Sequence, residues 1–273
     1  MNSVFMSLID RMKGDDLLDL GVIPWSSPVP FFGDAEKALV ATLGLNPSNR
    51  EFEDKDGEEL KGYGRRFQTL RSLEISSWED ARIEHAEKVY RSCQNYFEIN
   101  PYGQWFNALE RIMEGIPASY YNRKKHTACH LDLVPYATFE KWGALSSNKK
   151  SMLVRTSVDP LISILKSTKI RLIILNGKSV VDYFELVSGV KLNQKIEPSF
   201  KLLRKSGKHV NGISYKGAFK ELLGIDVGRE VRVVGYNHNI QSSFGVTNLV
   251  RDSIKSYVSN EARGVLCEVT GKK

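Results

Sequence analysis

Four polar turns in this sequence carry side chains that could do chemistry. Each follows a short apolar run, and they are Asn46-Pro47-Ser48-Asn49, Pro135-Tyr136, Asn176-Gly177-Lys178-Ser179 and Tyr236-Asn237-His238-Asn239. Amide, hydroxyl, ammonium and imidazole groups at such turns can orient water, bind anions or donate hydrogen bonds. A P-loop needs a glycine five residues before its Gly-Lys pair, but position 172 is Leu. Lys178 could therefore hold a single phosphate, or its turn could only cap a helix.

The histidines and cysteines do not predict a metal site or a disulfide framework. No histidine has a cysteine or carboxylate partner at ligand spacing among His85, His126, His130, His209 and His238. The cysteines Cys93, Cys129 and Cys267 are widely separated, which favours a reducing compartment. We therefore expect neither a metal nor another cofactor.

The apolar runs before the polar turns have the character of buried strands. They are short, rich in Val, Ile and Leu, and almost continuously apolar, and they span Ala38–Leu45, Thr127–Val134, Ile170–Leu175 and Val231–Gly235. Helical spacing of apolar residues at Trp105–Met113 and Val158–Leu165 alternates with these runs. This alternation predicts an α/β fold with a central four-stranded parallel sheet, and a ligand site outside the carboxyl ends of the strands.

The size and composition of the chain predict one folded domain. With 273 residues, 41% hydrophobic and 26% charged, the chain is far from the composition of disordered proteins. It has no repeats and no long linker, so we expect a single domain over residues 1–273. Two segments, 50–61 and 191–228, read as insertions that form surface excursions.

The net charge of +7 and the isoelectric point near 9.2 favour a polyanionic partner such as DNA, although a solvated basic surface would give the same numbers. No stretch approaches the roughly 20 apolar residues that span a bilayer. The first residues, Met1–Leu20, lack the basic-then-apolar order of a leader. We expect a cytoplasmic monomer that binds no membrane.

The polar turns also occur in the order of a known family. The segment Gly44-Leu-Asn-Pro-Ser48, preceded by Pro28–Asp34, resembles the water-activating motif of the uracil-DNA glycosylase superfamily. The resemblance continues through Trp105-Phe106, the second strand, the strand and turn at Ile170–Gly177, and a last strand that leads to His238. It covers roughly residues 22–257 and implies a three-layer α/β/α fold.

The resemblance implies the two catalytic residues. Cleavage of an N-glycosidic bond builds positive charge on the sugar and negative charge on the departing base. By resemblance, Asn46 holds the attacking water near the C1′ carbon, and His238 donates a hydrogen bond to the leaving base. An asparagine is not a strong base, so this chemistry depends on positioning. The alternatives are a turn residue at Asn46 and a solvent-facing loop histidine at 238.

Two departures from the uracil-specific branch of the superfamily suggest the substrate. That branch has a bulky tyrosine where this chain has Ser48, so a 5-substituent on the base would have room. It also has an asparagine where Asp132 aligns, and an ionised aspartate can only accept hydrogen bonds. Asp132 therefore suits the N4 amino group of a cytosine-type base, unless it forms a structural ion pair or caps a helix.

The resemblance also implies residues that grip DNA. Extrusion of a base requires a side chain that fills the gap and groups that hold the neighbouring phosphates. The wedge candidates are Ile240, Gln241 and Phe244, the phosphate contacts are Ser242 and Ser243 together with Lys178, and the strand-gripping pair is Arg65 and Arg66. An aromatic ring must also stack on the flipped base, and Phe52 is the first choice before Phe67.

The sequence thus predicts a monofunctional DNA glycosylase that releases a modified pyrimidine and leaves an abasic site. Removal of glucosylated 5-hydroxymethylcytosine from phage DNA, as an antiviral defence, fits the open C5 edge. Two alternatives remain open: repair of uracil or mismatched thymine, and a non-catalytic nucleic-acid-binding domain of the same fold.

Overall fold

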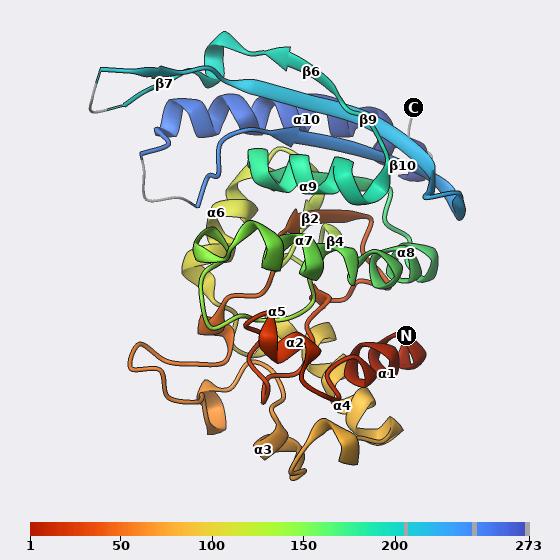
Figure 1. Cartoon of the computed structure of the whole chain (residues 1–273). Coiled ribbons are helices and arrows are strands. Elements are labelled where there is room, and N and C mark those ends of the chain that lie inside the picture. Colours follow the sequence, from red (N-terminus) through yellow and green to blue (C-terminus); the bar gives the residue numbers. More distant parts are fainter. Residues whose placement is uncertain (205–206, 242–244, 271–273) are drawn as a thin grey trace. The chain divides into compact units, whose positions relative to one another are not determined.

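The computed structural model describes residues 1–204, 207–241 and 245–270. Two compact units make up the chain (Figure 1). The first unit comprises Met1–Ala35, Gly44–Tyr102 and His130–Thr168, and the second comprises Glu36–Leu43, Gly103–Cys129 and Lys169–Lys273. The single domain predicted for residues 1–273 stays a prediction. None of the described helices is long and apolar enough to cross a membrane.

Parallel strands form the centre of the sheet in the second unit. Strand β5 (Leu172–Asn176) lies between β2 (Val40–Gly44) and β10 (Ile225–Tyr236), and both pairings are parallel. Every residue of β2 and of β5 is buried, as expected for strands covered on both faces. The predicted α/β class with a mostly parallel central sheet is confirmed.

Beyond β10 the sheet continues with antiparallel strands that the sequence analysis did not predict. Strand β10 pairs with β9 (Ile213–Leu222), and β9 pairs with β6 (Asn193–Ile196), as the long neighbouring ribbons in Figure 1 show. Segment 191–228 therefore contributes sheet structure rather than only a surface excursion. The physical reason is that Tyr215, Phe219 and Leu222 of β9 are buried.

Three helices of the second unit accompany the sheet. Helices α9 (Lys178–Ser188) and α10 (Asn248–Thr270) both contact β5 and β10, and α10 also contacts α6 (Gly103–Met113). The helix predicted from Trp105 is therefore confirmed. The remaining elements of this unit are η5 (Pro198–Phe200), the pair β7 (Leu202–Leu203) and β8 (His209–Val210), and β3 (Ala118–Ser119), which pairs with the start of β4 (His126–Asp132).

Helices dominate the first unit. Helix α1 (Asn2–Asp10) contacts α4 (Ile83–Gln94) and α8 (Val158–Ser167), the second of the two predicted helices. Strand β1 (Phe31–Phe32) pairs antiparallel with the end of β4. The other helices are α2 (Asp16–Asp19), α3 (Leu70–Leu73), α5 (Tyr96–Ile99) and α7 (Ser147–Arg155), with 3-10 turns η1 (Asn49–Glu51), η2 (Gly62–Gly64), η3 (Trp78–Asp80) and η4 (Trp142–Ala144).

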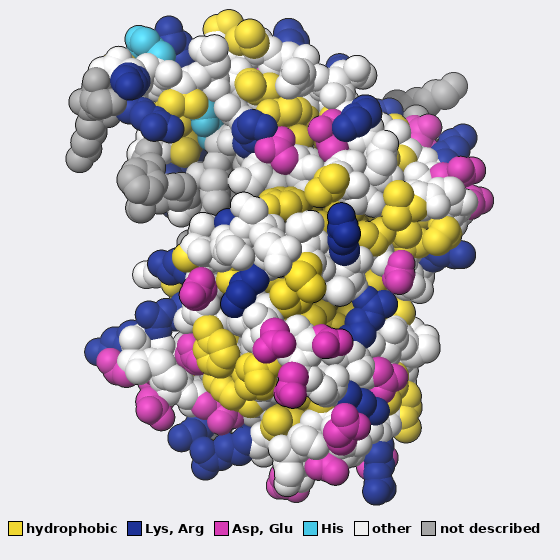
Figure 2. Space-filling view, viewed as in Figure 1, with side chains coloured by type: hydrophobic (Ala, Val, Ile, Leu, Met, Phe, Trp, Pro, Cys, Tyr) yellow, Lys and Arg dark blue, Asp and Glu magenta, His cyan; other side chains and the backbone are white. Residues whose placement is uncertain are grey.

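Charged side chains of both signs lie on the face shown in Figure 2. On the face shown in Figure 2, Lys and Arg side chains are interspersed with Asp and Glu, and no large area carries one sign alone. The positive side chains of this face are therefore not gathered into one continuous patch.

Candidate functional site

The ends of β2 and β4 bring Asn46 and Asp132 to the same edge of the first unit. The Leu133 amide donates a hydrogen bond to the Gly44 carbonyl, and the Val134 amide donates to the Leu45 carbonyl. Both segments run in the same direction, so residues that follow the two strands lie beside one another. Asn46 and Asp132 thus lie at the carboxyl ends of neighbouring parallel segments, and their joint role in a site stays a prediction.

The amide of Asn46 is held in one orientation. Its Nδ2 donates to the carbonyl oxygens of Pro47 (3.2 Å) and Tyr136 (3.3 Å), and to Oγ1 of Thr138 (3.1 Å). The Thr138 hydroxyl donates its own proton to the Glu140 carbonyl at 2.7 Å. Three acceptors around one atom require that atom to be the NH₂ group. Within the described parts of the chain no group donates to Asn46 Oδ1, so this oxygen is available to a water.

Asp132 is a buried carboxylate with an unused acceptor. It is 5% exposed, and its Oδ1 lies 3.3 Å from Nε2 of His130, too poorly aligned for a hydrogen bond. Burial raises the pKa of Asp132, whereas His130 opposes the shift. A Cβ at Gly44 would lie 2.4 Å from Asp132 Oδ1, so this carboxylate fits only because position 44 is glycine. Oδ1 of Asp132 is therefore packed against Gly44, the last residue of β2.

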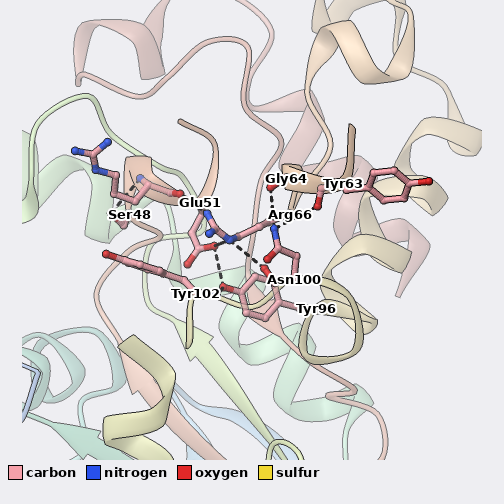
Figure 3. Close-up of polar contacts among 9 residues, drawn as sticks. Ser48, Glu51, Tyr63, Gly64, Arg66, Tyr96, Asn100 and Tyr102 are labelled. Atoms are coloured by element: carbon pink, nitrogen blue, oxygen red, sulfur yellow. Dashed lines mark hydrogen bonds and ion pairs between the residues drawn. The ribbon is translucent and has the colours of Figure 1, made fainter. Parts of the chain in front are cut away.

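A second buried carboxyl, Glu51, lies in the turn that follows Asn46. Its Oε2 accepts a hydrogen bond of 2.8 Å from the Tyr96 hydroxyl and lies 3.8 Å from Nε of Arg66 (Figure 3). The Tyr96 oxygen also accepts the Tyr102 amide at 2.9 Å, so the hydroxyl proton is directed to Glu51. Burial raises the pKa of Glu51 to about 7, with a smaller contribution from the charge of Asp132. Glu51 and Asp132 are thus two buried acids whose charges interact.

The raised pKa of Glu51 predicts a pH-dependent stability. Because the folded state binds the proton more tightly than the unfolded chain, stability is greatest below the ordinary pKa of 4.5 and falls as the pH rises through about 7. The loss amounts to up to about 3 kcal/mol. We expect Glu51→Gln to remove this slope, so that urea unfolding shows the variant gaining on the wild type from about pH 5 to about pH 8.

An exposed carboxyl of the same loop provides the matched control. Glu58→Gln changes the same chemical group at an exposed position, and its stability should follow the wild-type pH profile. If Glu51→Gln retains the wild-type slope as well, Glu51 is not the group that titrates.

The predicted base-binding residues Ser48, Phe52 and Phe67 differ in exposure. Ser48 is exposed, and its Oγ accepts the Arg50 amide at 3.2 Å, capping η1. Phe52 and Phe67 are each 1% exposed, with ring centroids 5.6 Å apart. Phe67 already stacks on Tyr96 at 5.1 Å. Both rings belong to an aromatic cluster of the first unit, and stacking on a base stays a prediction for them.

Arg66 is anchored, whereas Arg65 is not. Arg66 donates to the carbonyls of Asn100 (3.0 Å) and Arg50 (2.7 Å), and its guanidinium lies over the Tyr102 ring, 5.4 Å from the centroid. Arg65 takes part in no ion pair with any described residue. The anchored arginine fixes the loop, so the neighbouring one is better suited to bind an external anion.

His238 lies in the second unit and is buried, not solvent-facing. Its Nε2 is 2.6 Å from the Phe200 carbonyl, and an acceptor there requires the ring proton on Nε2. Burial lowers the pKa of His238, opposed by this hydrogen bond. The neutral ring therefore has no further N–H in this arrangement, and the donor role of His238 to a leaving base stays a prediction.

The other predicted DNA contacts of the second unit make internal bonds. Lys178 follows Gly177, whose φ of +100° favours glycine, and its Nζ binds both oxygens of Asp182 at 2.7 Å. Ile240 is 1% exposed, and Gln241 binds the Asn176 side chain and, at 3.2 Å, the Trp105 carbonyl. The predicted residues Ser242, Ser243 and Phe244 lie outside the described residues.

Sequence reasoning missed Glu51 and His130. Nothing in the sequence separates Glu51 from the other acids of segment 50–61, and only burial reveals it. His130 stands two residues before Asp132 on one strand, so the alternation of strand side chains could have placed both on one face. Within the described ranges, no three His, Cys, Asp or Glu side chains gather as they would around a metal ion.

No protein-family model matches the chain, and no curated protein matches it either.

Proposed function

We propose that this chain is a DNA glycosylase of the uracil-DNA glycosylase superfamily, with the three-layer α/β/α fold and four central parallel strands of that superfamily. It hydrolyses the N-glycosidic bond of a flipped-out, 5-substituted pyrimidine and leaves an abasic site. Glucosylated 5-hydroxymethylcytosine of phage DNA is the proposed substrate, and antiviral defence in the cytoplasm is the proposed role.

The orientation of the Asn46 amide carries this proposal. Three oxygens hold its Nδ2, so Oδ1 can accept a hydrogen bond from one water and direct a lone pair of that water to C1′. The bond between C1′ and the base nitrogen breaks, and its electron pair leaves with the base. The water oxygen bonds to C1′, and the proton that it loses passes to the departing base.

Asp132 supports the choice of a cytosine-type base. An ionised carboxylate accepts from an N4 amino group and repels the O4 carbonyl of uracil. The exposed Ser48, at the position after the motif's proline, leaves the C5 edge open. Negative charge on the buried acids Asp132 and Glu51 also favours the positive charge that develops on the sugar.

A substrate panel tests the proposal. Oligonucleotides with uracil, a thymine mismatch, 5-hydroxymethylcytosine or its glucosylated form are incubated with the protein, and abasic sites are cut with alkali. We expect the fastest strand scission with a 5-substituted cytosine. Fastest release of uracil would instead favour the repair alternative.

One observation favours the non-catalytic alternative. His238 is buried with its Nε2 bonded to Phe200, so the described arrangement lacks the leaving-base donor that the resemblance implies. A protein that binds the oligonucleotides of the panel but releases no base from any of them would establish this alternative.

A further inference from the structure

A basic pocket opens in the first unit, and Arg66 of its wall lies 3.8 Å from the buried Glu51. Its volume is about 550 Å³. Its walls come from the η2 loop and from the face and end of α4, with Ile99 and Asn100 closing it. Four cations line it, namely Arg65, Arg66, Lys88 and Arg91, and the described lining contains no carboxylate.

Two of the four cations are uncompensated. Arg91 pairs with Glu87, and Arg66 lies near the buried Glu51. Neither Arg65 nor Lys88 forms an ion pair with any residue that the structure describes. On α4, Lys88 and Arg91 are three residues apart, so they project from one helix face. The pocket therefore has a net positive charge that suits an anionic ligand.

The loop that carries Arg65 is held in a fixed shape. The Asn100 side chain donates to the carbonyls of Tyr63 (3.4 Å) and Gly64 (3.0 Å), and the Arg66 guanidinium returns a bond to the Asn100 carbonyl. Tyr63 is fully exposed at the pocket edge, and Figure 3 shows its ring pointing away from the Arg66 and Glu51 contacts. An exposed aromatic ring thus lies beside unpaired cations on a rigid loop.

We propose that this pocket binds a single-stranded nucleic-acid segment, with a phosphodiester between Arg65 and Lys88 and a base stacked on Tyr63. Cationic grooves with an exposed aromatic ring are the general solution for single strands, because every base has a face that stacks. Under the proposed function, this strand is the one that flanks the excised base. The pocket itself depends only on the contacts above, so its binding can be measured without base release.

The test uses a fluorescein-labelled oligothymidylate with unmodified bases. It measures binding alone, since no base is expected to be released from this strand. Anisotropy titrations compare the wild type, Arg65→Gln/Lys88→Gln and Tyr63→Ala between about 50 and 200 mM salt. We expect the double variant to bind about tenfold or more weakly, with a salt slope smaller by about 0.7, since one phosphate contact contributes about 0.7 on a single strand. Tyr63→Ala should weaken binding about fivefold or more.

Lys141→Gln/Arg155→Gln is the matched control, since it removes two exposed cations of the same unit outside the pocket. It should bind nearly as the wild type does. Equal affinities of the pocket and control double variants would overturn the proposal. Suppose that Arg65→Gln/Lys88→Gln loses binding, that Tyr63→Ala has no effect, and that tripolyphosphate competes as well as the oligonucleotide does. This result would overturn the binding of a strand and leave an anion site.

The two proposals fail in different ways. Strand binding that depends on the pocket, together with no base release in the substrate panel, refutes only the glycosylase function. Base release that continues while pocket variants bind as the wild type does refutes only the pocket.

Discussion

Replacing Asn46 by alanine is expected to lower the rate of base release by about 10²- to 10³-fold, the cost of one preorganised hydrogen-bonding group at a reacting centre. The physical reason is that Oδ1 of Asn46 is the atom proposed to hold the water. The measurement is single-turnover strand scission of the best substrate in the panel, after alkali treatment.

The same substitution also has a structural cost that must be separated from its chemical effect. Alanine leaves the Tyr136 carbonyl and the Thr138 oxygen without the Asn46 donor, which costs about 1–3 kcal/mol of stability if water does not replace it. Urea unfolding and circular dichroism at the assay temperature establish that the variant is folded. Asn148→Ala, at an exposed position of α7, is the matched control and should retain the wild-type rate.

Asn46→Asp sharpens the test. A carboxylate places an oxygen against the three acceptors that now surround Nδ2, so repulsion raises the pKa of the new acid and destabilises the fold at high pH. Relative to the wild type, we expect this variant to be less stable at about pH 8 than at about pH 5. We also expect its rate of base release not to exceed that of the wild type. A faster Asn46→Asp enzyme would show that a general base, rather than a positioned water, limits the reaction.

The sequence was sufficient to predict the strand ends at which Asn46 and Asp132 lie. Continuous apolar runs specify strands that are buried on both faces, and parallel strands direct their following turns to one edge. The confirmed strands β2, β4, β5 and β10 overlap the predicted runs because this pattern is local. Strand β9 was missed because exposed residues interrupt its buried ones, and β6 was missed because all four of its residues are exposed.

The environment of each side chain could not be predicted in the same way. Glu51 is buried because Tyr96, 45 residues away, and Arg66 approach it, and no local pattern contains that information. The basic pocket likewise joins Arg65 to Lys88 from separate elements. His238 was expected to donate a hydrogen bond outward, but its Nε2 is bonded to the Phe200 carbonyl. Burial and partners are long-range properties, so they appear only in the fold.

The second large effect is expected at the base-reading position. Asp132→Asn replaces an oxygen that only accepts by an amide that both accepts and donates, and an amide can pair with the O4 and N3 edge of uracil. A site built for one hydrogen-bonding pattern rejects the other strongly, because a mismatched buried group stays unpaired. We expect the ratio of release rates, 5-substituted cytosine over uracil, to fall by about 10²-fold or more.

This change of specificity separates a reading role from a structural one. If Asp132 only balanced His130, 3.3 Å away, Asp132→Asn would slow release of all bases equally and leave their ratio unchanged. The control Asp19→Asn makes the same chemical change at an exposed position of α2. Stability also distinguishes the two roles. Burial raises the pKa of Asp132, so removing its charge should not destabilise the fold at about pH 8. Loss of a stabilising ion pair with His130 would instead destabilise the fold at this pH. A folded variant with inverted preference is the result that assigns Asp132 to the base.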